Sequence, residues 1–215
     1  MDRYKTVNYA EQFHFPFVIK CMSKFIIIST IVLGVLALAY YFIVENLEDV
    51  ETQKYYVEKE DNLIEIRIYE ESIIARTSAG GDYKEASSKG FRKLAGYIFG
   101  SNKEDKKIAM TSPVWMSTDG QNSEMHFIMP SEYDMEELPD PVDNTVVLDS
   151  FNGGRYAAIR FGGYANDEKI ELYQQKLALW LLENNYNASG DSFYVGYNSP
   201  FKIYNRRNEI LIALK

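Results

Sequence analysis

The feature that most constrains this chain is an apolar stretch, residues 25–44, that contains no charged side chain. At ~1.5 Å of rise per residue, a helix of this length spans roughly 30 Å, the thickness of the hydrocarbon core of a bilayer. Tyr40 and Tyr41 fall near its end, and aromatic side chains favour the membrane interface. The stretch therefore predicts a transmembrane helix. It divides the chain into a short tail (1–24), an anchor (25–44), an acidic linker (45–54) and a globular domain (55–215).

Charges on the two sides of this stretch predict its orientation. The upstream tail has more basic than acidic side chains: Arg3, Lys5, Lys20 and Lys24 against Asp2 and Glu11. Downstream, four acidic residues precede the first basic one, Lys54. Basic flanks stay in the cytoplasm, so we expect a single-pass protein whose C-terminal domain is periplasmic, extracellular or lumenal. A cleaved signal peptide is the alternative, because Ala37-Leu38-Ala39 fits a small-residue cleavage site. The apolar run continues to Val44 and favours an anchor.

The scarcity of cysteine and histidine excludes several kinds of site. Cys21 is the only cysteine and precedes the domain, which excludes disulfides within the chain and CxxC chemistry. His14 and His126 are the only histidines, so a zinc site of the HExxH type cannot form in the domain. The formal net charge of -8 argues against nucleic acid as a partner, because phosphate binding needs a basic surface. With no nucleotide-binding loop or metal motif, we expect a binding protein rather than an enzyme.

The domain is predicted to contain one structural unit twice: a hairpin, a helix and a second hairpin. The first unit has strands at 63–69 and 73–78, a helix at 82–99, and strands at 108–116 and 124–129 joined across Asp119-Gly120. After an acidic crossover at 130–144, the second has strands at 145–151 and 155–161, a helix at 166–185, and strands at 192–197 and 209–214. Two helices on a mostly antiparallel sheet make an α+β domain with pseudo-twofold halves.

The helix at 82–99 has one apolar face. Its members recur at the spacing of a helix packed on a core: Tyr83, Ala86, Gly90, Leu94 and Tyr97, with Phe91 and Ile98 beside them. The small residues in this face predict a close approach to the sheet.

Short motifs follow one another along the domain. They are IEIRIY (64–69), GFRKLAGYIFGSN (90–102), KIAMTSPV (107–114), IMPSEY (128–133), FGGYA (161–165), GYNSPFK (196–202) and RRNEI (206–210). In these motifs the chain resembles the SOUL family of haem-binding proteins. The resemblance implies a distorted antiparallel β-barrel flanked by two helices. It also implies a shallow apolar groove between the first helix and the loop that carries Lys202, with haem or another tetrapyrrole as its ligand.

The positions that contact haem in the family are kept only in part. The family's iron-ligating histidine lies on the first strand, and the matching residue here is Ile68, so the resemblance implies no histidine axial ligand. Members without that histidine use two basic residues of the first helix and a lysine of the late loop to meet the haem propionates. The matching helix residues here are Ser88 and Gly96, whereas the lysine is retained as Lys202.

Other residues can supply part of what is missing. Arg92 lies between positions 88 and 96 on one stripe of the helix and offers a guanidinium to a carboxylate, with Lys89 on the same side. Both are equally compatible with an ordinary solvated helix face. Phe91 offers apolar contact from the same helix, and the loop 198–208 is unusually cationic for an acidic domain, which steers anions. His126 alternates with apolar neighbours and is interpreted as a hydrogen-bonded strand histidine, not as an iron ligand.

The sequence thus predicts a membrane-anchored protein that holds haem or a related tetrapyrrole in an apolar groove without a histidine ligand. One alternative is that the groove holds another amphipathic ligand, a lipid or a hydrophobic organic anion. A second is a membrane-tethered protein-interaction module whose groove is filled by its own side chains. Asn187-Ala188-Ser189 is also an N-glycosylation sequon, relevant if the domain enters a eukaryotic secretory route.

Overall fold

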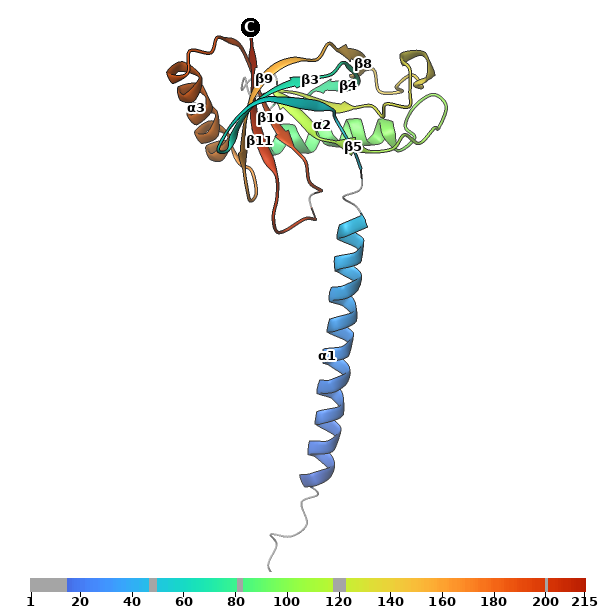
Figure 1. Cartoon of the computed structure of the whole chain (residues 1–215). Helices are drawn as coiled ribbons and strands as arrows, with labels where there is room; N and C mark the ends of the chain where they lie inside the picture. Colours follow the sequence, from blue (N-terminus) through green and yellow to red (C-terminus); the bar gives the residue numbers. More distant parts are fainter. Residues whose placement is uncertain (1–14, 47–49, 81–82, 118–122, 200) are drawn as a thin grey trace, which may run out of the picture. The chain divides into compact units, whose positions relative to one another are not determined.

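The computed structural model describes residues 15–46, 50–80, 83–117, 123–199 and 201–215. The chain divides into two compact units, Met1–Leu47 and Glu48–Lys215. Figure 1 shows the helices and strands of each unit along the chain.

The first unit is the helix α1, Phe15–Asn46, of 32 residues. It begins earlier than the predicted residue 25, and Pro16 lies in its first turn, where a proline is favoured because its missing N–H needs no partner. The segment Met22–Phe42 is long and apolar enough to cross a membrane, judged by length and composition, a property that signal sequences share. The side chains of this segment are exposed, which in an apolar helix suits a lipid environment.

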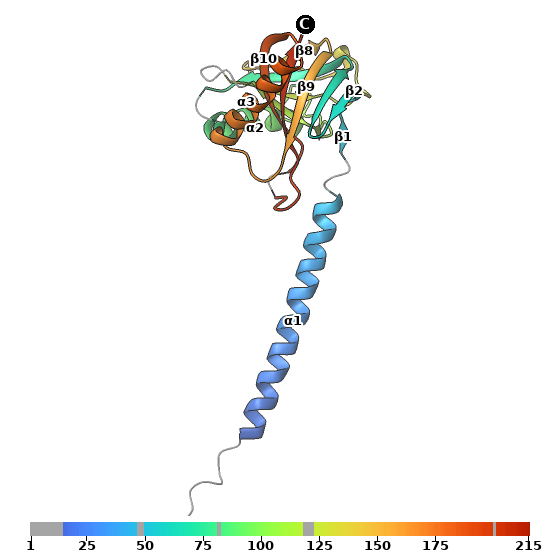
Figure 2. The ribbon, with the colours of Figure 1, turned by 60° about the vertical axis from the view of Figure 1, so that its left-hand side comes forward.

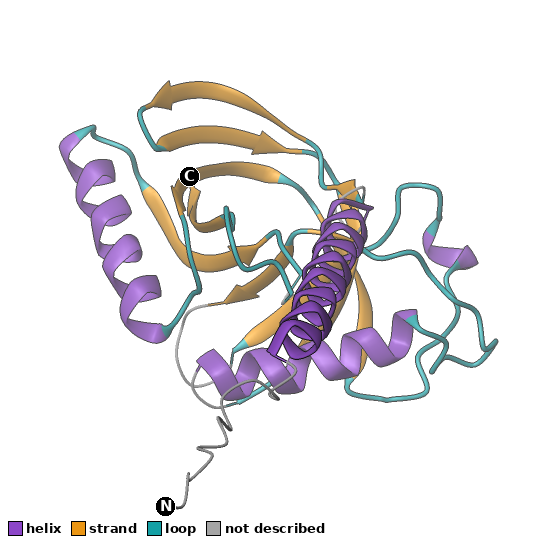
Figure 3. Cartoon of the chain, turned by 90° about the horizontal axis from the view of Figure 1, so that it is seen from below, coloured by secondary structure: helices purple, strands orange, loops and turns teal. Residues whose placement is uncertain are grey.

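Among the described residues of the second unit, nine strands form one antiparallel sheet and two short strands form a parallel pair. The sheet order is β2-β3-β9-β11-β10-β6-β7-β4-β8. The strands are β2 Tyr55–Asp61, β3 Ile64–Tyr69, β4 Ser72–Ser78, β6 Val114–Ser117, β7 Glu124–Ile128, β8 Val146–Phe151, β9 Gly154–Phe161, β10 Ala188–Gly196 and β11 Asn208–Leu214. The parallel pair is β1 Glu51–Thr52 with β5 Thr111–Ser112. The sheet curls into a half-barrel (Figures 1 and 3), so the predicted α+β barrel class is confirmed.

The strand order contains the predicted repeat. The strands β3, β4, β6 and β7 of the first repeat correspond to β8, β9, β10 and β11 of the second. When each strand is replaced by its counterpart, the order from β3 to β8 is the same read in either direction. The β6–β10 pair lies at the centre of this pseudo-twofold relation. The second hairpin of each unit, β6–β7 and β10–β11, is also confirmed. The turn predicted at Asp119-Gly120 lies outside the described residues.

The prediction of the first hairpin in each of the two repeats of the domain is wrong. β3 pairs with β2 and β9 rather than with β4, and β8 pairs with β4 rather than with β9. The two repeats of the domain therefore exchange strands: β3 pairs with β9, and β4 pairs with β8. The physical reason is that Glu70-Glu71, between β3 and β4, lacks the glycine or asparagine that a two-residue hairpin turn requires. The strand β2, which was not predicted, supplies the missing partner through a turn at Asn62, whose φ is 55°.

The connection from β8 to β9, Asn152-Gly153, has the composition of a hairpin turn, but its glycine has another role. The φ of +67° at Gly153 is favoured by glycine, and a Cβ atom there would lie 2.4 Å from the carbonyl oxygen of Tyr69. The glycine therefore allows this connection to pass directly against the end of β3. It is needed where the chain passes from one repeat to the other, and it does not form a tight turn between paired strands.

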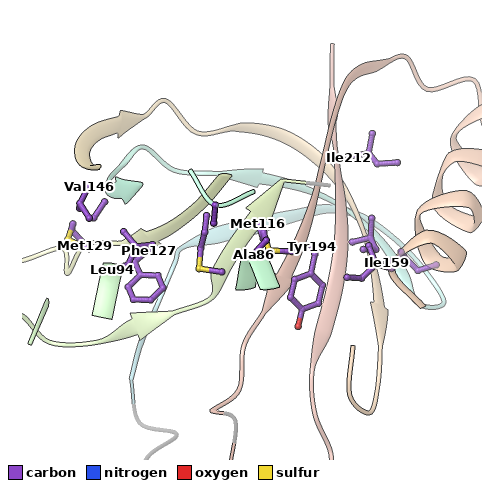
Figure 4. Packing of buried hydrophobic residues seen from close by; sticks show 14 of the residues in the cluster. Ala86, Leu94, Met116, Phe127, Met129, Val146, Ile159, Tyr194 and Ile212 are labelled. Carbon is purple, nitrogen blue, oxygen red and sulfur yellow. The ribbon is translucent and has the colours of Figure 1, made fainter. Parts of the chain in front are cut away.

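Two helices cover one face of the sheet. The helix α2, Tyr83–Ile98, packs on β4, β7 and β8, and α3, Asp167–Glu183, packs on β9, β10 and β11. The side chain of Asn166 caps α3 by accepting a hydrogen bond from the Lys169 amide. The predicted α2 face is largely buried, and a Cβ atom on Gly90 would lie 3.2 Å from the Met125 Cβ, which confirms the close approach. Figure 4 shows the apolar cluster between these layers.

The opposite face of the sheet carries a second core of aromatic residues centred on Trp115. At one end of it lies a buried ion cluster, in which the Arg67 guanidinium donates two hydrogen bonds of 2.6 and 3.0 Å to the Glu209 carboxylate. Burial raises the pKa of Glu209, but the hydrogen bond and charge of Arg67 and the charge of Arg207 outweigh it and lower that pKa. Glu209 is therefore ionised and joins β3, β11 and the loop before β11.

The predicted linker 45–54 differs from the structure at both ends. α1 continues to Asn46, and β1 already belongs to the domain. Gln53, which follows β1, is buried, and its side-chain oxygen accepts a 2.9 Å hydrogen bond from the indole N–H of Trp115. The short polar sequence was interpreted as linker because its partners are distant in the chain.

Candidate functional site

A groove between α2 and the sheet is the candidate ligand site. It encloses about 750 Å³, within the range of roughly 300–1,000 Å³ typical of small-molecule sites. Its walls come from α2, from β6, β7 and β10, and from the segments before α3 and β11. The lining residues are Tyr83, Ser87, Ser88, Phe91, Arg92, Ala95, Gly96, Phe99, Val114, Met116, Met125, Tyr164, Tyr194, Gly196, Asn198 and Arg206.

Four of the five predicted site residues line this groove. Ser88, Phe91, Arg92 and Gly96 are all on α2 and all contribute to its wall. Phe91 is fixed by an edge-on contact with Phe127, at 5.3 Å between ring centroids. A Cβ atom added at Gly96 would have its nearest side-chain neighbour 3.8 Å away, so this position leaves open space on the helix.

The floor of the groove is apolar and aromatic. Met116 and Met125 are buried, and Tyr194 packs edge-on against Tyr83 at 5.1 Å between ring centroids. The Tyr194 hydroxyl donates a 2.8 Å hydrogen bond to the Asn208 side-chain oxygen. Burial is the largest cause of a raised pKa at both Tyr83 and Tyr194, so the two phenols are uncharged. This floor suits a flat apolar surface.

Arg206 lies at the loop side of the groove. Its guanidinium donates hydrogen bonds to the carbonyl oxygens of Ser199 and Lys202, at 2.9 and 2.6 Å, and its Cζ atom lies 4.6 Å from the centre of the Tyr164 ring. Its Nε atom is buried and has no hydrogen-bond partner among the described residues. Lys202 belongs to the same loop, but it is not among the residues that line the groove, whereas Arg206 is.

The charge of the groove has one sign. Arg92 and Arg206 are its charged lining residues, and no aspartate or glutamate lines it within the described part of the chain. Arg92 forms no hydrogen bond or ion pair with described residues, whereas Lys89, its predicted neighbour, pairs with Glu85 one turn earlier on α2. In a chain of net charge -8, two guanidinium groups on an apolar groove select for an anionic, largely apolar ligand.

The described residues place no histidine in this groove. His126 is on β7, but its side chain lies on the opposite face of the sheet, stacked on Trp115 at 5.5 Å between ring centroids. It is buried, and its Nε2 atom has no partner among the described residues, so the expected hydrogen-bonded histidine is corrected to an apolar environment. Burial, and then the charge of Arg76, lower the pKa of His126 to about 4. Ile68 is on β3 and does not line the groove.

Sequence reasoning missed the sheet side of the groove. Met125 follows from the alternation of β7, since residues two apart share a face and Phe127 contacts Phe91. Tyr164 belongs to the FGGYA motif, which marked it as a residue of interest, but only the fold brings it beside Arg206. These residues depend on pairings between strands that are distant in sequence.

The half-barrel, its two covering helices and the apolar, cationic groove define a small-molecule-binding domain. The SOUL heme-binding protein family matches residues 50–213, and the chain belongs to that family. Its description names a binding activity, in agreement with the expectation of a binding protein rather than an enzyme.

Two animal proteins are similar to this chain in sequence, and one solved structure is similar to it in fold. The chain is 31% identical to "Heme-binding protein 1" of Xenopus laevis over 161 residues, which cover 71% of this chain and 84% of that protein. It is 31% identical to "Heme-binding protein 2" of Homo sapiens, over 70% of this chain and 78% of that protein. The crystal structure of the EcmrR C-terminal domain has a TM-score of 0.55 at 9% identity, covering 75% of this chain and 98% of that domain, and is similar in fold alone.

Proposed function

We propose that this protein binds haem or a related tetrapyrrole in the α2 groove and is held at a membrane by α1. The observation that carries the proposal is the composition of the groove. Aromatic and methionine side chains form its floor, two arginines lie on its walls, and no carboxylate lines it within the described residues. A tetrapyrrole with carboxylate substituents combines a flat apolar ring with anionic groups and matches this arrangement.

The residues of this chain divide the binding between apolar contact and charge. Phe91, Tyr83 and Met116 would contact the ring, because they present buried or half-buried apolar surface to the groove. Arg92 would meet a carboxylate, since no described residue neutralises it. Arg206 offers a second guanidinium, and Lys202 in the same loop adds positive charge near the opening. Ser88 and Gly96 would leave room rather than charge.

The iron of haem is not needed for this mode of binding. Position 68, which matches the family's histidine, is isoleucine, and the imidazole of His126 lies outside the groove, stacked on Trp115. Haem iron, when bound, can take an axial ligand and change redox state. The affinity proposed here comes from ring contact and carboxylate contact, so metal-free protoporphyrin is expected to bind about as tightly as haem.

The helix α1 would act as a membrane anchor, with the domain on the non-cytoplasmic side. The support is the apolar segment Met22–Phe42 and the excess of basic residues before it. A signal sequence also passes the test of length and composition. Resistance of the full chain to extraction by alkaline carbonate separates an anchor from a removed signal.

An absorption titration of residues 45–215 with haem and with metal-free protoporphyrin tests the proposal. Saturable spectral shifts are expected with both ligands. Arg92→Ala should weaken both by about three- to tenfold, the effect of one partly exposed charge-assisted contact. Arg160→Ala removes an exposed arginine of β9 outside the groove and should leave both titrations unchanged. No saturable shift with either ligand, or equal losses in the two variants, would contradict the proposal.

A lipid or another hydrophobic anion is a second candidate, and one observation favours it. The two helix positions that are basic in the family are Ser88 and Gly96 here, which weakens the recognition of two propionates. Competition by a long-chain fatty acid in the same titration distinguishes the two, because it should displace protoporphyrin only weakly if the tetrapyrrole is the better ligand. The groove of about 750 Å³ is not filled by its own side chains, which counts against the protein-interaction alternative.

A further inference from the structure

The loop between β10 and β11 exposes large apolar side chains beside the groove. Phe201 is 71% exposed, Ile203 64% and Tyr204 55%. Exposed apolar side chains that gather at one place mark interaction sites, whereas single ones are ordinary. Phenylalanine, isoleucine and tyrosine together are also the composition of loops that enter the interfacial layer of a bilayer, where tyrosine is enriched.

Hydrogen bonds hold the base of this loop together. The Arg207 amide donates to the Asn198 side-chain oxygen across the base of the loop, and the Arg207 guanidinium bonds to the buried Glu209. Arg206 bonds to the carbonyl oxygens of Ser199 and Lys202 within the loop. Phe201, Ile203 and Tyr204 form the tip of the loop, which extends from this hydrogen-bonded base.

The same loop forms part of the groove. Arg206 and Asn198 line the groove, and the Arg206 guanidinium lies over the ring of Tyr164, which is exposed and also lines it. Phe99, at the end of α2, adds a further exposed aromatic ring to the lining. The loop that carries the apolar tip therefore also forms part of the groove wall.

The covalent chain keeps the domain near any bilayer that α1 crosses. From Asn46, the last residue of α1, to Val50, before β1, four residue steps reach at most ~14 Å at ~3.5 Å per residue. Within the domain, Figure 2 shows β1 and the β10–β11 loop extending from the same side, and Figure 1 shows the loop at that side from another direction. The start of the domain and the β10–β11 loop are therefore at one end of it.

We propose that the tip Phe201, Ile203 and Tyr204 inserts into the interfacial layer of the bilayer that holds α1, so that the groove opens toward the lipid. This inference rests on the proposed function, because it requires the anchor. The ligand would then be an amphipathic anion dissolved in the membrane, reaching Arg206 and the aromatic floor without crossing bulk water. The loop is both a docking element and the entrance to the groove.

The test uses the full chain in vesicles of equal parts phosphatidylcholine and phosphatidylglycerol. In a Cys21→Ser background, which removes the only cysteine, Ile203→Cys is labelled with an environment-sensitive fluorophore. The matched control is Leu182→Cys on α3, a residue that is 73% exposed. The proposal predicts blue-shifted emission at 203 and quenching by brominated acyl chains, with neither effect at 182.

Equal, water-like emission at the two positions would overturn the proposal, and so would equal quenching at both, which would mean that the whole domain rests on lipid. Release of the chain from the vesicles by carbonate would overturn the anchor and this inference together. A protoporphyrin titration in the same vesicles separates the ligand question. Binding without quenching at 203 refutes the membrane contact alone, and quenching without binding refutes the tetrapyrrole proposal alone.

Discussion

Acid should destabilise the domain through His126, the buried histidine of β7. The side chain stacks on Trp115 and lies near Phe151 and Phe193, at 6.3 Å between ring centroids in both cases. Burial, and then the charge of Arg76, lower its pKa from 6.5 to about 4. Because the folded chain binds fewer protons at this site than the unfolded chain, this contribution to stability is complete above about pH 6.5. It falls as the pH drops toward 4.

The size of the effect follows from the difference between the two pKa values. Each pKa unit corresponds to ~1.4 kcal/mol, so the full loss between pH 6.5 and pH 4 is roughly 3 kcal/mol. Between pH 7 and pH 5 the same two pKa values give about 2 kcal/mol. A loss of this size is a large part of the 5–15 kcal/mol that typically stabilises a domain.

Urea unfolding of residues 45–215 at pH 7 and at pH 5, followed by tryptophan fluorescence, measures this loss. Other groups also titrate, so the comparison is with His126→Leu, which removes the buried imidazole. The wild type should lose about 2 kcal/mol more than this variant between the two pH values. Phe127→Leu, a buried change at the next position of β7, is the matched control and should lose as much as the wild type. If wild type and His126→Leu lost the same free energy, the imidazole would not be buried as described.

Further predictions concern the groove, the ion cluster and the topology. Gly96→Arg restores a basic residue at an open position of α2 and should tighten protoporphyrin binding by about tenfold, or ~1.4 kcal/mol, in an absorption titration; weaker binding would contradict the geometry of the groove. Glu209→Gln removes the buried one of the two carboxylates that pair with Arg67, leaving only the partly exposed Glu65, and should cost roughly 3 kcal/mol in urea unfolding at pH 7. Glu58→Gln, at an exposed pair, should cost far less. The exposed sequon residue Asn187 should be glycosylated when the full chain is translated with microsomes, and Asn187→Gln should not be; an unmodified wild type would contradict a lumenal domain.

Some elements of the fold could be predicted from sequence because they have a local period. Alternation indicated β3, and the 3.6-residue spacing of apolar residues indicated α2, whose predicted face is largely buried. The strand β2 escaped because it is an exposed strand at one end of the sheet and has no apolar alternation. Local patterns therefore indicate elements where one face is buried.

The pairing of strands could not be predicted in the same way. A strand followed by a short polar connection and another strand suggests a hairpin, yet the two units exchange their first strands. A glycine is required at position 153 by the carbonyl oxygen of Tyr69, which is distant in the sequence. Information of this kind lies in tertiary packing and has no local signal.

The candidate site likewise has one side that local spacing predicts and one side that depends on tertiary contacts. Its helix side, Ser88, Phe91, Arg92 and Gly96, was accessible because helical spacing places these residues on one wall. On the loop side, the sequence pointed to Lys202, whereas Arg206 is the cation that lines the groove. Which of several cations in one loop faces inward depends on hydrogen bonds at its base, and a sequence does not show these.

The central claim is that a tetrapyrrole lies in the α2 groove, and methyl NMR of residues 45–215 with labelled methionines tests it most directly. Met116 and Met125 line the groove, whereas Met110 and Met129 lie outside it. A diamagnetic ring stacked on the groove floor shifts nearby methyl resonances through its ring current. Addition of metal-free protoporphyrin should therefore shift Met116 and Met125 strongly and leave Met110 and Met129 in place. Shifts confined to Met110 and Met129, or no shifts at saturating ligand, would contradict the account.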